Sequence, residues 1–424
     1  MASTAHITSS LWSSLFIDLL NYEQWPSPYP NSASLNAMLD HHLKLSRNFP
    51  LHISLILPES NEDTRYVLKT LSACSARWAS LYLDTDWDLL RDCDFRRVAN
   101  NLPLLKQLWI EGFTSSLSQE ITGPFQSAPI LTELSIQGHR PPSPSSDARL
   151  CFPWNQLANL TLRHCLTSTA LQYLELASQA RQIALLRCSN NDFRARPGQY
   201  PRVIRCHRLL QSLCITIDDR DPELSVIFNH LTLPSLTDLQ IAGFVDEDED
   251  NIDGPPSSEN FFFTSEQGAI TSFFARSECR LTSLSLKNLP LHDIEIISFL
   301  QQIPSLTVLT IHEQLDKDEY DATSFTSHFF ECLTIGYTEP TCTLLPRLAE
   351  LDLRYDVSSF PTSDFLRMIQ SRWIPDAAYA AQLGVDSLTS VTLRPQKHQD
   401  GKNVELGLDS LKALHVAGLC VSVS

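Results

Sequence analysis

The strongest constraint on this chain is an apolar pattern, L-x-x-L-x-L, that recurs along most of its length. The first position is usually Leu, the other two are Leu, Ile or Val, and several copies follow a proline by one or two residues. Ten copies are clear and two weaker ones fit the same template. Their first positions are Trp78, Leu105, Leu131, Leu157, Ala180, Leu210, Leu236, Leu281, Leu306, Leu348, Leu388 and Leu411, with Trp78 and Ala180 opening the weak copies.

This pattern predicts a short strand, because its second and third apolar residues lie two apart and so share one side of an extended chain, while the first packs in from the preceding turn. One such strand cannot bury its inner face, but parallel strands stacked with the connecting segments returning over the back form a continuous apolar ladder. Eight of the eleven separations between first positions are 23 to 30 residues, in or near the period of about 20 to 29 of leucine-rich repeats. We therefore predict an α/β fold, a leucine-rich-repeat solenoid with a curved parallel sheet on the concave face and helices and irregular loops on the convex face.

Features between the strands support this register. Apolar residues at helical spacing predict helices over Asp293–Ile303 and Asp364–Ser371. Four copies place a glycine two residues past the third apolar position, where it suits a tight turn out of the strand; these are Gly112, Gly138, Gly243 and Gly418. Cys165 and Cys188 occupy the position that is Asn or Cys in leucine-rich repeats, where the side chain would cap turn amides or pack.

The chain divides into an N-terminal segment and cap over residues 1–60 and an irregular repeat domain over residues 61–424. In the cap we expect a helix over Ser34–Leu45 and a strand containing Leu51, Ile53 and Leu55. The cap would cover the open edge of the array, which otherwise exposes apolar surface and unpaired backbone groups. Three insertions have the composition of surface loops, and they are His139–Ser146, Asn190–Pro201 and Val245–Asn260.

The third insertion, an acidic loop over residues 245–260, must protrude into solvent because burying so many like charges is prohibitive. The spacing of Asp246, Asp248 and Asp250 raises the alternative of a calcium loop. That loop requires Gly at its sixth position and Glu at its twelfth, where this chain has Asn251 and Ser257. We therefore favour a solvated acidic loop and expect no metal site.

Composition excludes several classes of function. The net charge of -17 would repel a phosphate backbone or an anionic membrane surface, so neither nucleic acid nor membrane is an expected partner. No apolar run approaches the roughly 20 residues of a membrane span. Eleven cysteines occur without a C-x-x-C pair or a secretory leader, which favours reduced thiols and a cytoplasmic or nuclear location. The motifs of dinucleotide, phosphate-loop, serine-hydrolase and zinc-protease sites do not occur, so we expect neither an enzyme nor a cofactor.

The candidate binding site is formed by the strand residues that alternate with the leucines and would line the concave face. A Trp and a Tyr among polar neighbours are typical of anchor residues that bind a protein partner. An equally good explanation is that these two side chains cover the edge of the core. The predicted partner-binding residues are Tyr82, Gln107, Trp109, Glu111, Glu133, Ser135, Arg163, Glu350, Asp352 and Arg354.

Several sequence segments resemble those of a known family, the fungal F-box proteins whose C-terminal region is an irregular leucine-rich-repeat array. They include Leu11-Trp12-Ser13-Ser14-Leu15, Arg77-Trp78-Ala79-Ser80-Leu81, Leu102-Pro103-Leu104-Leu105, Pro153-Trp154-Asn155-Gln156-Leu157, Arg276-Ser277 and Ser371-Arg372. In that family an N-terminal F-box docks on the Skp-type adaptor of a cullin ubiquitin ligase, and the repeats capture substrate. The first phrase resembles the segment that follows the F-box, so the F-box itself is expected to be missing here.

The resemblance implies a noncatalytic scaffold similar to the substrate-binding region of a ubiquitin-ligase receptor. Its alternative is a regulatory or decoy leucine-rich-repeat protein unconnected to a ubiquitin ligase. The Skp-type adaptor is a partner only if an F-box is present upstream.

Overall fold

The computed structural model describes residues 9–20, 32–58, 60–85, 87–92, 95–112, 122–137, 151–188, 205–217, 224–243, 263–313, 324–336, 344–396 and 409–423. Internal contacts divide the chain into an N-terminal unit, Met1–Cys188, and a C-terminal unit, Ser189–Ser424. The three predicted insertions, His139–Ser146, Asn190–Pro201 and Val245–Asn260, lie outside the described residues.

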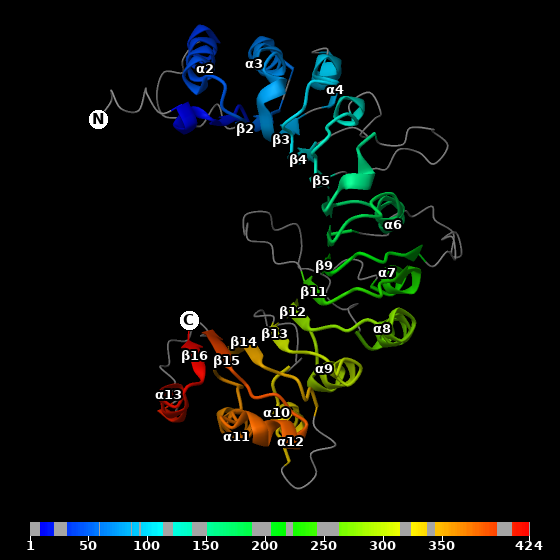
Figure 1. The fold of residues 1–424 in the computed structure, drawn as a ribbon, viewed down its shortest axis with the longest axis vertical. Coiled ribbons are helices and arrows are strands. Elements are labelled where there is room, and N and C mark those ends of the chain that lie inside the picture. Colours follow the sequence, from blue (N-terminus) through cyan, green and yellow to red (C-terminus); the bar gives the residue numbers. More distant parts are fainter. Residues whose placement is uncertain are drawn as a thin grey trace. The chain divides into compact units, whose positions relative to one another are not determined.

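The N-terminal unit is an α/β structure with an open parallel sheet. Its described strands pair in chain order, each with the next (Figure 1). They are β1 (Ser14–Asp18), β2 (Leu51–Leu57), β3 (Trp78–Thr85), β4 (Gln107–Glu111), β5 (Glu133–Gln137), β6 (Asn159–Arg163) and β7 (Gln182–Leu186). Parallel pairing of consecutive strands requires the chain to return over one side of the sheet after every strand.

The apolar pattern marks the buried side of this sheet. The second and third pattern residues align from strand to strand and are at most 5% exposed; they are Leu81/Leu83, Leu108/Ile110, Leu134/Ile136, Leu160/Leu162 and Ile183/Leu185. Leu105, Leu131 and Leu157, the first residues of three copies, are 0% exposed. The predicted strands of this unit are therefore confirmed, including both weak copies.

The returning segments form the other layer of the N-terminal unit (Figure 1). They contain α2 (Ser32–Ser46), α3 (Glu62–Ser72), α4 (Trp87–Asp92) and α6 (Thr167–Leu176), with short 3-10 helices at η1 (Ser9–Trp12), η3 (Ser75–Arg77), η4 (Phe95–Val98), η5 (Gly123–Phe125) and η6 (Trp154–Gln156). Aromatic rings link these segments, with neighbouring centroids 5.3 to 6.3 Å apart, in the order Trp78, Phe95, Phe125, Phe152, Trp154 and Tyr173. The helix and strand predicted within residues 1–60 are present as α2 and β2, and β1 is a strand that the pattern did not predict.

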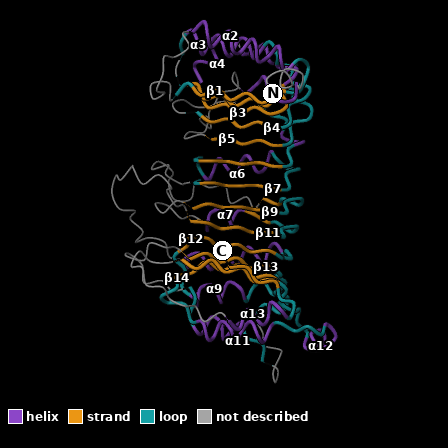
Figure 2. The backbone as a smooth tube through the Cα atoms, turned by 90° about the vertical axis from the view of Figure 1, so that its left-hand side faces the viewer, coloured by secondary structure: helices purple, strands orange, loops and turns teal. Residues whose placement is uncertain are grey.

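The C-terminal unit repeats this architecture, with parallel strands lying side by side (Figure 2). Its sheet contains β9 (Ser212–Ile217), β11 (Asp238–Gly243), β12 (Ser283–Leu289), β13 (Val308–Glu313), β14 (Glu350–Asp356), β15 (Ser390–Gln396) and β16 (Cys420–Val423), and a separate parallel pair is formed by β8 (Arg205–Cys206) and β10 (Leu231–Thr232). The first pattern residues from Leu210 to Leu388 are no more than 1% exposed. They therefore form the core that the sequence predicted.

The helices of the C-terminal unit are α7 (Leu224–His230), α8 (Phe263–Ser277), α9 (Asp293–Leu300), α10 (Ser327–Leu333), α11 (Thr362–Arg372), α12 (Ala377–Leu383) and α13 (Asp409–Val416). The predicted helices correspond to α9 and α11. On α9, Ile296, Ile297 and Leu300 are buried as expected, and the helix ends three residues before the predicted boundary. Their amphipathic spacing therefore identified the helices that cover this core.

Two Arg and Ser pairs at helix ends connect successive repeats of this unit. At the end of α8, Arg276 donates hydrogen bonds to the carbonyl oxygens of Phe228 and Leu231, and the Ser277 hydroxyl accepts one from the Leu233 amide at 3.1 Å. At the end of α11, Arg372 donates to the carbonyls of Leu333, Leu344 and Leu345, and the Ser371 hydroxyl accepts from the Ile335 amide at 3.0 Å. Each pair therefore satisfies the main chain of the preceding repeat.

The prediction for the last copy of the pattern was wrong. Leu411, Leu414 and Val416 lie on helix α13, where Leu411 is buried and Val416 is 87% exposed. The error has a simple cause, since two apolar residues three apart also share one face of a helix. The final strand is β16, which pairs with β15 and follows the turn at Gly418, where φ is 115°.

The predicted turn roles of Gly243 and Gly418 are revised, whereas Gly112 follows β4 as predicted and Gly138 lies outside the described residues. Gly243 is the last residue of β11, and an added Cβ there would lie 2.0 Å from the Asn288 carbonyl oxygen, so a close approach of two chain segments requires this glycine. Gly418 precedes a strand instead of following one. Cys165 and Cys188 pack against each other, with their Sγ atoms 3.2 Å apart.

Candidate protein-binding faces

Each sheet has a face opposite to its apolar ladder, and we call it the open face. In the N-terminal unit the strand register aligns its side chains in three rows. The first row is Ser14, His52, Ser80, Gln107, Glu133, Asn159 and Gln182; the central row is Phe16, Ser54, Tyr82, Trp109, Ser135, Thr161 and Ala184; the last row is Asp18, Ile56, Asp84, Glu111, Gln137, Arg163 and Leu186. All seven predicted binding residues of this unit lie on these rows.

Hydrogen bonds between neighbouring strands hold four of these predicted side chains in place. The Tyr82 hydroxyl donates to Glu111 Oε2 at 2.8 Å, and Gln107 Nε2 donates to Glu133 Oε2 at 2.7 Å. Burial raises the pKa of Tyr82 well above its usual value, and the bond to Glu111 adds to this effect. The phenol therefore remains a neutral donor at physiological pH.

Two predicted residues differ strongly in exposure. Arg163 is exposed at the end of β6, as expected of a binding residue. Ser135 also lies on the open face, but it is only 4% exposed. Its strand neighbour is Trp109, which faces it directly in the register, so the small hydroxyl lies among larger side chains. Ser135 is therefore a packing residue of this face and not a surface that a partner can reach.

The last row of the N-terminal unit contains an unusual carboxylate that the sequence analysis missed. Asp84 is 8% exposed, and its Oδ1 atom has no hydrogen-bond partner. Burial raises the pKa of Asp84 to about 6, and the nearby negative charges of Glu111 and Asp18 contribute to the shift. A buried carboxylate without a compensating partner is costly and calls for an explanation.

In the C-terminal unit, the three predicted residues alternate along β14. Glu350 is exposed. Asp352 accepts two hydrogen bonds from Arg394, at 3.1 Å from Nε and 3.2 Å from Nη2, and lies 3.4 Å from His312 Nε2. Arg354 donates a hydrogen bond to Asn288 Oδ1. Asp352 is therefore paired with Arg394, whereas Arg354 bonds a neutral amide side chain.

Burial affects the titration of two groups on the C-terminal open face. The pKa of His312 is lowered by burial, against the opposing effect of Asp352, so this imidazole is mostly neutral near pH 7. Burial also lowers the pKa of Arg354, and the neighbouring charge of Arg394 acts in the same direction. The guanidinium of Arg354 remains charged at physiological pH, because the ordinary pKa of an arginine lies far above 7.

His312 and Arg394 were also missed by the sequence analysis, although both occupy the strand positions that alternate with the apolar pattern. Counting every second residue of β13 and β15 would have placed both on the open face. Their interaction with Asp352 could not be read from the sequence, because the partners lie 40 and 42 residues away.

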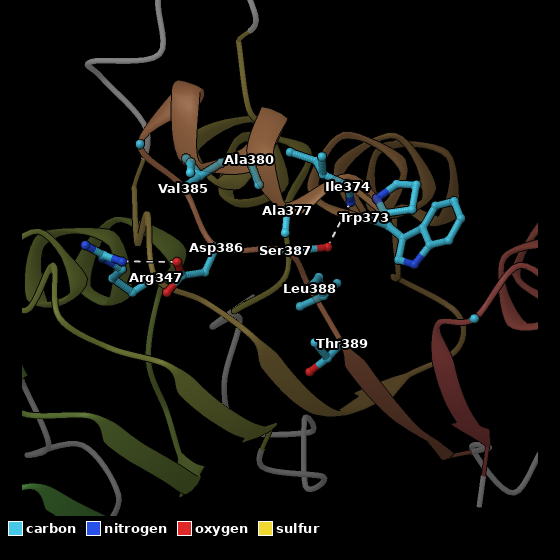
Figure 3. A pocket seen from close by; sticks show the side chains of 14 residues that line it. Arg347, Trp373, Ile374, Ala377, Ala380, Val385, Asp386, Ser387, Leu388 and Thr389 are labelled. Carbon is cyan, nitrogen blue, oxygen red and sulfur yellow. Dashed lines mark hydrogen bonds and ion pairs between the residues drawn. The ribbon is translucent and has the colours of Figure 1, made fainter.

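Away from the open faces, the C-terminal unit contains a cavity of about 520 Å³ between α12 and the segment that leads into β15. Arg347 and Asp386 form an ion pair of 3.1 Å on one side of it, and Trp373 lies on the other (Figure 3). The Ser387 hydroxyl accepts a hydrogen bond from the Ile374 amide at 2.9 Å. Small apolar side chains provide much of the remaining lining, and we assign no chemistry to this cavity.

Two absences among the residues that the structure describes concern metal ions and membranes. No group of three or more His, Cys, Asp or Glu side chains in these residues is arranged to hold a metal ion. In the same part of the chain, no helix combines the length and the apolar character needed to cross a lipid bilayer.

Comparison with known proteins adds no relative: no family model matches the chain, and no curated protein matches its sequence.

Proposed function

We propose that this chain is a noncatalytic protein-protein interaction scaffold, a leucine-rich-repeat solenoid that resembles the substrate-binding region of an F-box protein. The observation that supports the proposal best is that the two faces of each sheet differ in composition. On the strands from Leu81 to Leu393 the apolar residues of the pattern are buried in the core, and the alternating positions carry mainly polar and aromatic side chains on an open face. Such a face binds by shape and charge complementarity and needs no catalytic group.

Trp109 is the proposed anchor residue, and its replacement tests the proposal most directly. It is half-buried on the central row, directly opposite Tyr82 in the register and beside polar neighbours on β4. Aromatic side chains in such surroundings contribute a large share of binding energy at protein interfaces. The partner is a protein in the cytoplasm or nucleus, and the cellular role depends on whether the scaffold is attached to a ubiquitin ligase.

The test is affinity purification of the tagged full-length chain from cells of its source, with Trp109→Ala beside the wild type. The matched control is Tyr379→Ala, which removes an aromatic that is 43% exposed on α12. The amount of the proteins that are recovered with both wild type and control should fall at least about tenfold with Trp109→Ala. Truncation of an anchor residue costs more than about 1.4 kcal/mol of binding free energy. Equal recovery with Trp109→Ala would contradict the proposal, and loss of its folded state would assign Trp109 to the core.

The same purification separates the two cellular roles. Recovery of a Skp-type adaptor would support a ubiquitin-ligase substrate receptor. Consistent absence of the adaptor, with other partners retained, would support the regulatory or decoy scaffold.

A further inference from the structure

The last row of the N-terminal open face concentrates negative charge. The register places Asp84 directly beside Glu111, with Asp18 two strands away on the other side of Ile56. Neighbouring strands are about 4.8 Å apart, so these carboxylates repel one another across the sheet. Among the open-face positions of strands β1 to β7, Arg163 is the one Lys or Arg, and it lies two strands beyond Glu111.

Asp84 shows that this repulsion is not compensated within the described structure. Its side chain is more than nine-tenths buried, and Oδ1 lacks a hydrogen-bond donor. Oδ1 is also cut off from water, since it is one of the fully buried side-chain oxygens. A cation bound at the neighbouring, partly exposed Glu111 would stabilise this buried charge without contacting Oδ1.

The central row provides apolar surface next to these acceptors. Tyr82 and Trp109 face each other on β3 and β4, each two residues before an acidic residue of the last row. Phe16, two strands from Tyr82 on the same row, is 67% exposed. Aromatic surfaces of this kind accommodate the methylene stem of a lysine or arginine and attract its charged head. The hydrogen bond from Tyr82 to Glu111 fixes the orientation of one acceptor in advance.

We propose that the open face of the N-terminal unit binds a basic segment of its protein partner, whose lysine or arginine side chain lies along Tyr82 and Trp109 and ends at Glu111, beside the buried charge of Asp84. The inference rests on the proposed function and names the chemistry of the partner. It fits the acidic character of the whole chain, whose net charge is -17 and which would steer a basic partner toward this surface.

The test is selection of a displayed library of random short peptides on the immobilised full-length chain. Peptides enriched on the wild type should be rich in Lys and Arg relative to the starting library. Replacing the central lysine of a selected peptide by norleucine keeps the stem and removes the charge, so it should weaken binding by about tenfold to a hundredfold. Binding should also weaken with added NaCl, because the Debye length falls from about 10 Å at 0.1 M to about 3 Å at 1 M.

The variants Asp84→Asn and Glu111→Gln keep the size of each side chain and remove its charge. Each variant should bind the selected peptides at least about tenfold more weakly than the wild type does. The control is Glu62→Gln, which changes net charge equally at an exposed residue of α3 and should alter binding less than about twofold. A global charge effect would weaken peptide binding equally in all three variants, and this result would overturn the inference.

Other outcomes are equally decisive. Basic peptides that bind Asp84→Asn and Glu111→Gln as tightly as the wild type would overturn the inference. Neutral or acidic peptides that lose binding on Trp109→Ala would overturn it while leaving the proposed function standing. Failure to enrich any peptide would count against the inference, and the proposed function would then be decided by the purification of partners.

Discussion

Replacement of the buried Arg372 by methionine should destabilise the C-terminal unit by about 3 kcal/mol. The guanidinium is 0% exposed and donates hydrogen bonds to the carbonyls of Leu333, Leu344 and Leu345. The Leu333 and Leu344 carbonyls lose this donor at about 1 to 3 kcal/mol each, and the Leu345 carbonyl, which keeps its bond from the Leu348 amide, loses a charge-assisted bond of about 1.5 to 3 kcal/mol. Together these losses come to roughly 6 kcal/mol. Against this, burial lowers the pKa of Arg372 from its ordinary value to about 10, so removing the charge relieves roughly 3 kcal/mol of desolvation cost.

Hydrogen exchange followed by mass spectrometry on the full-length chain is the suitable assay, because repeat structures open locally and a global melting temperature would average over both units. A loss of about 3 kcal/mol corresponds to exchange about 150-fold faster where local opening controls exchange. The acceleration should appear in Ser327–Leu333 and Thr362–Arg372, whereas peptides from the N-terminal unit should not change.

The matched control is Arg367→Met on the same helix. Its side chain is 62% exposed and pairs with Asp364 one turn earlier, so its removal should cost less than about 0.5 kcal/mol. Exchange in Arg372→Met within about threefold of the wild type would refute the reasoning, because the carbonyls would then have found other donors at little cost. Arg372→Lys should resemble the methionine variant, since an ammonium cannot reach three diverging carbonyls in the way a guanidinium does.

Two further predictions concern the core and the open face. Leu236→Ala should lower the free energy of unfolding by about 2 to 5 kcal/mol in urea denaturation, because Leu236 is 0% exposed and its loss leaves a cavity; a loss under about 1 kcal/mol would contradict its place in the ladder. The folded-state pKa of Asp84, about 6, exceeds its ordinary value of 3.8, so the folded protein binds more protons between these values and stability falls as pH rises from about 4 to about 6. Asp84→Asn should remove this fall, on the order of 1 kcal/mol after screening by solvent, and an identical pH profile in the variant would contradict the assignment.

The strands could be predicted from the sequence because each apolar pattern must be buried, and only a parallel register that aligns the patterns buries all of them. Leu105, Leu236 and Leu348 are all 0% exposed for this reason. The same argument failed at Leu411, where apolar residues three apart fit a helix as well as the end of a turn. It also missed β1, where Phe16 points outward and only Leu15 and Ile17 alternate as the pattern requires.

The candidate site was predictable as a set of positions but not as a set of interactions. Alternation along a strand places Tyr82, Glu111 and Asp352 on open faces without any knowledge of their neighbours. The state of Asp84 depends on its neighbours on other strands, and the register that brings Glu111 beside it is set by the whole sheet. For the same reason, the ion pair of Asp352 with Arg394 could be found only from the structure.

The Arg and Ser pairs at the ends of α8 and α11 delay the completion of hydrogen bonding while the chain is being synthesised. Arg276 follows the Leu231 carbonyl that it satisfies by 45 residues, and Arg372 follows Leu333 by 39. At about 5 to 20 residues per second, a ribosome takes roughly 2 to 9 seconds to supply the missing donor. Until then the Leu231 and Leu333 carbonyls lack their arginine donors, so each of these two repeats reaches its final hydrogen bonding only when its successor has been made.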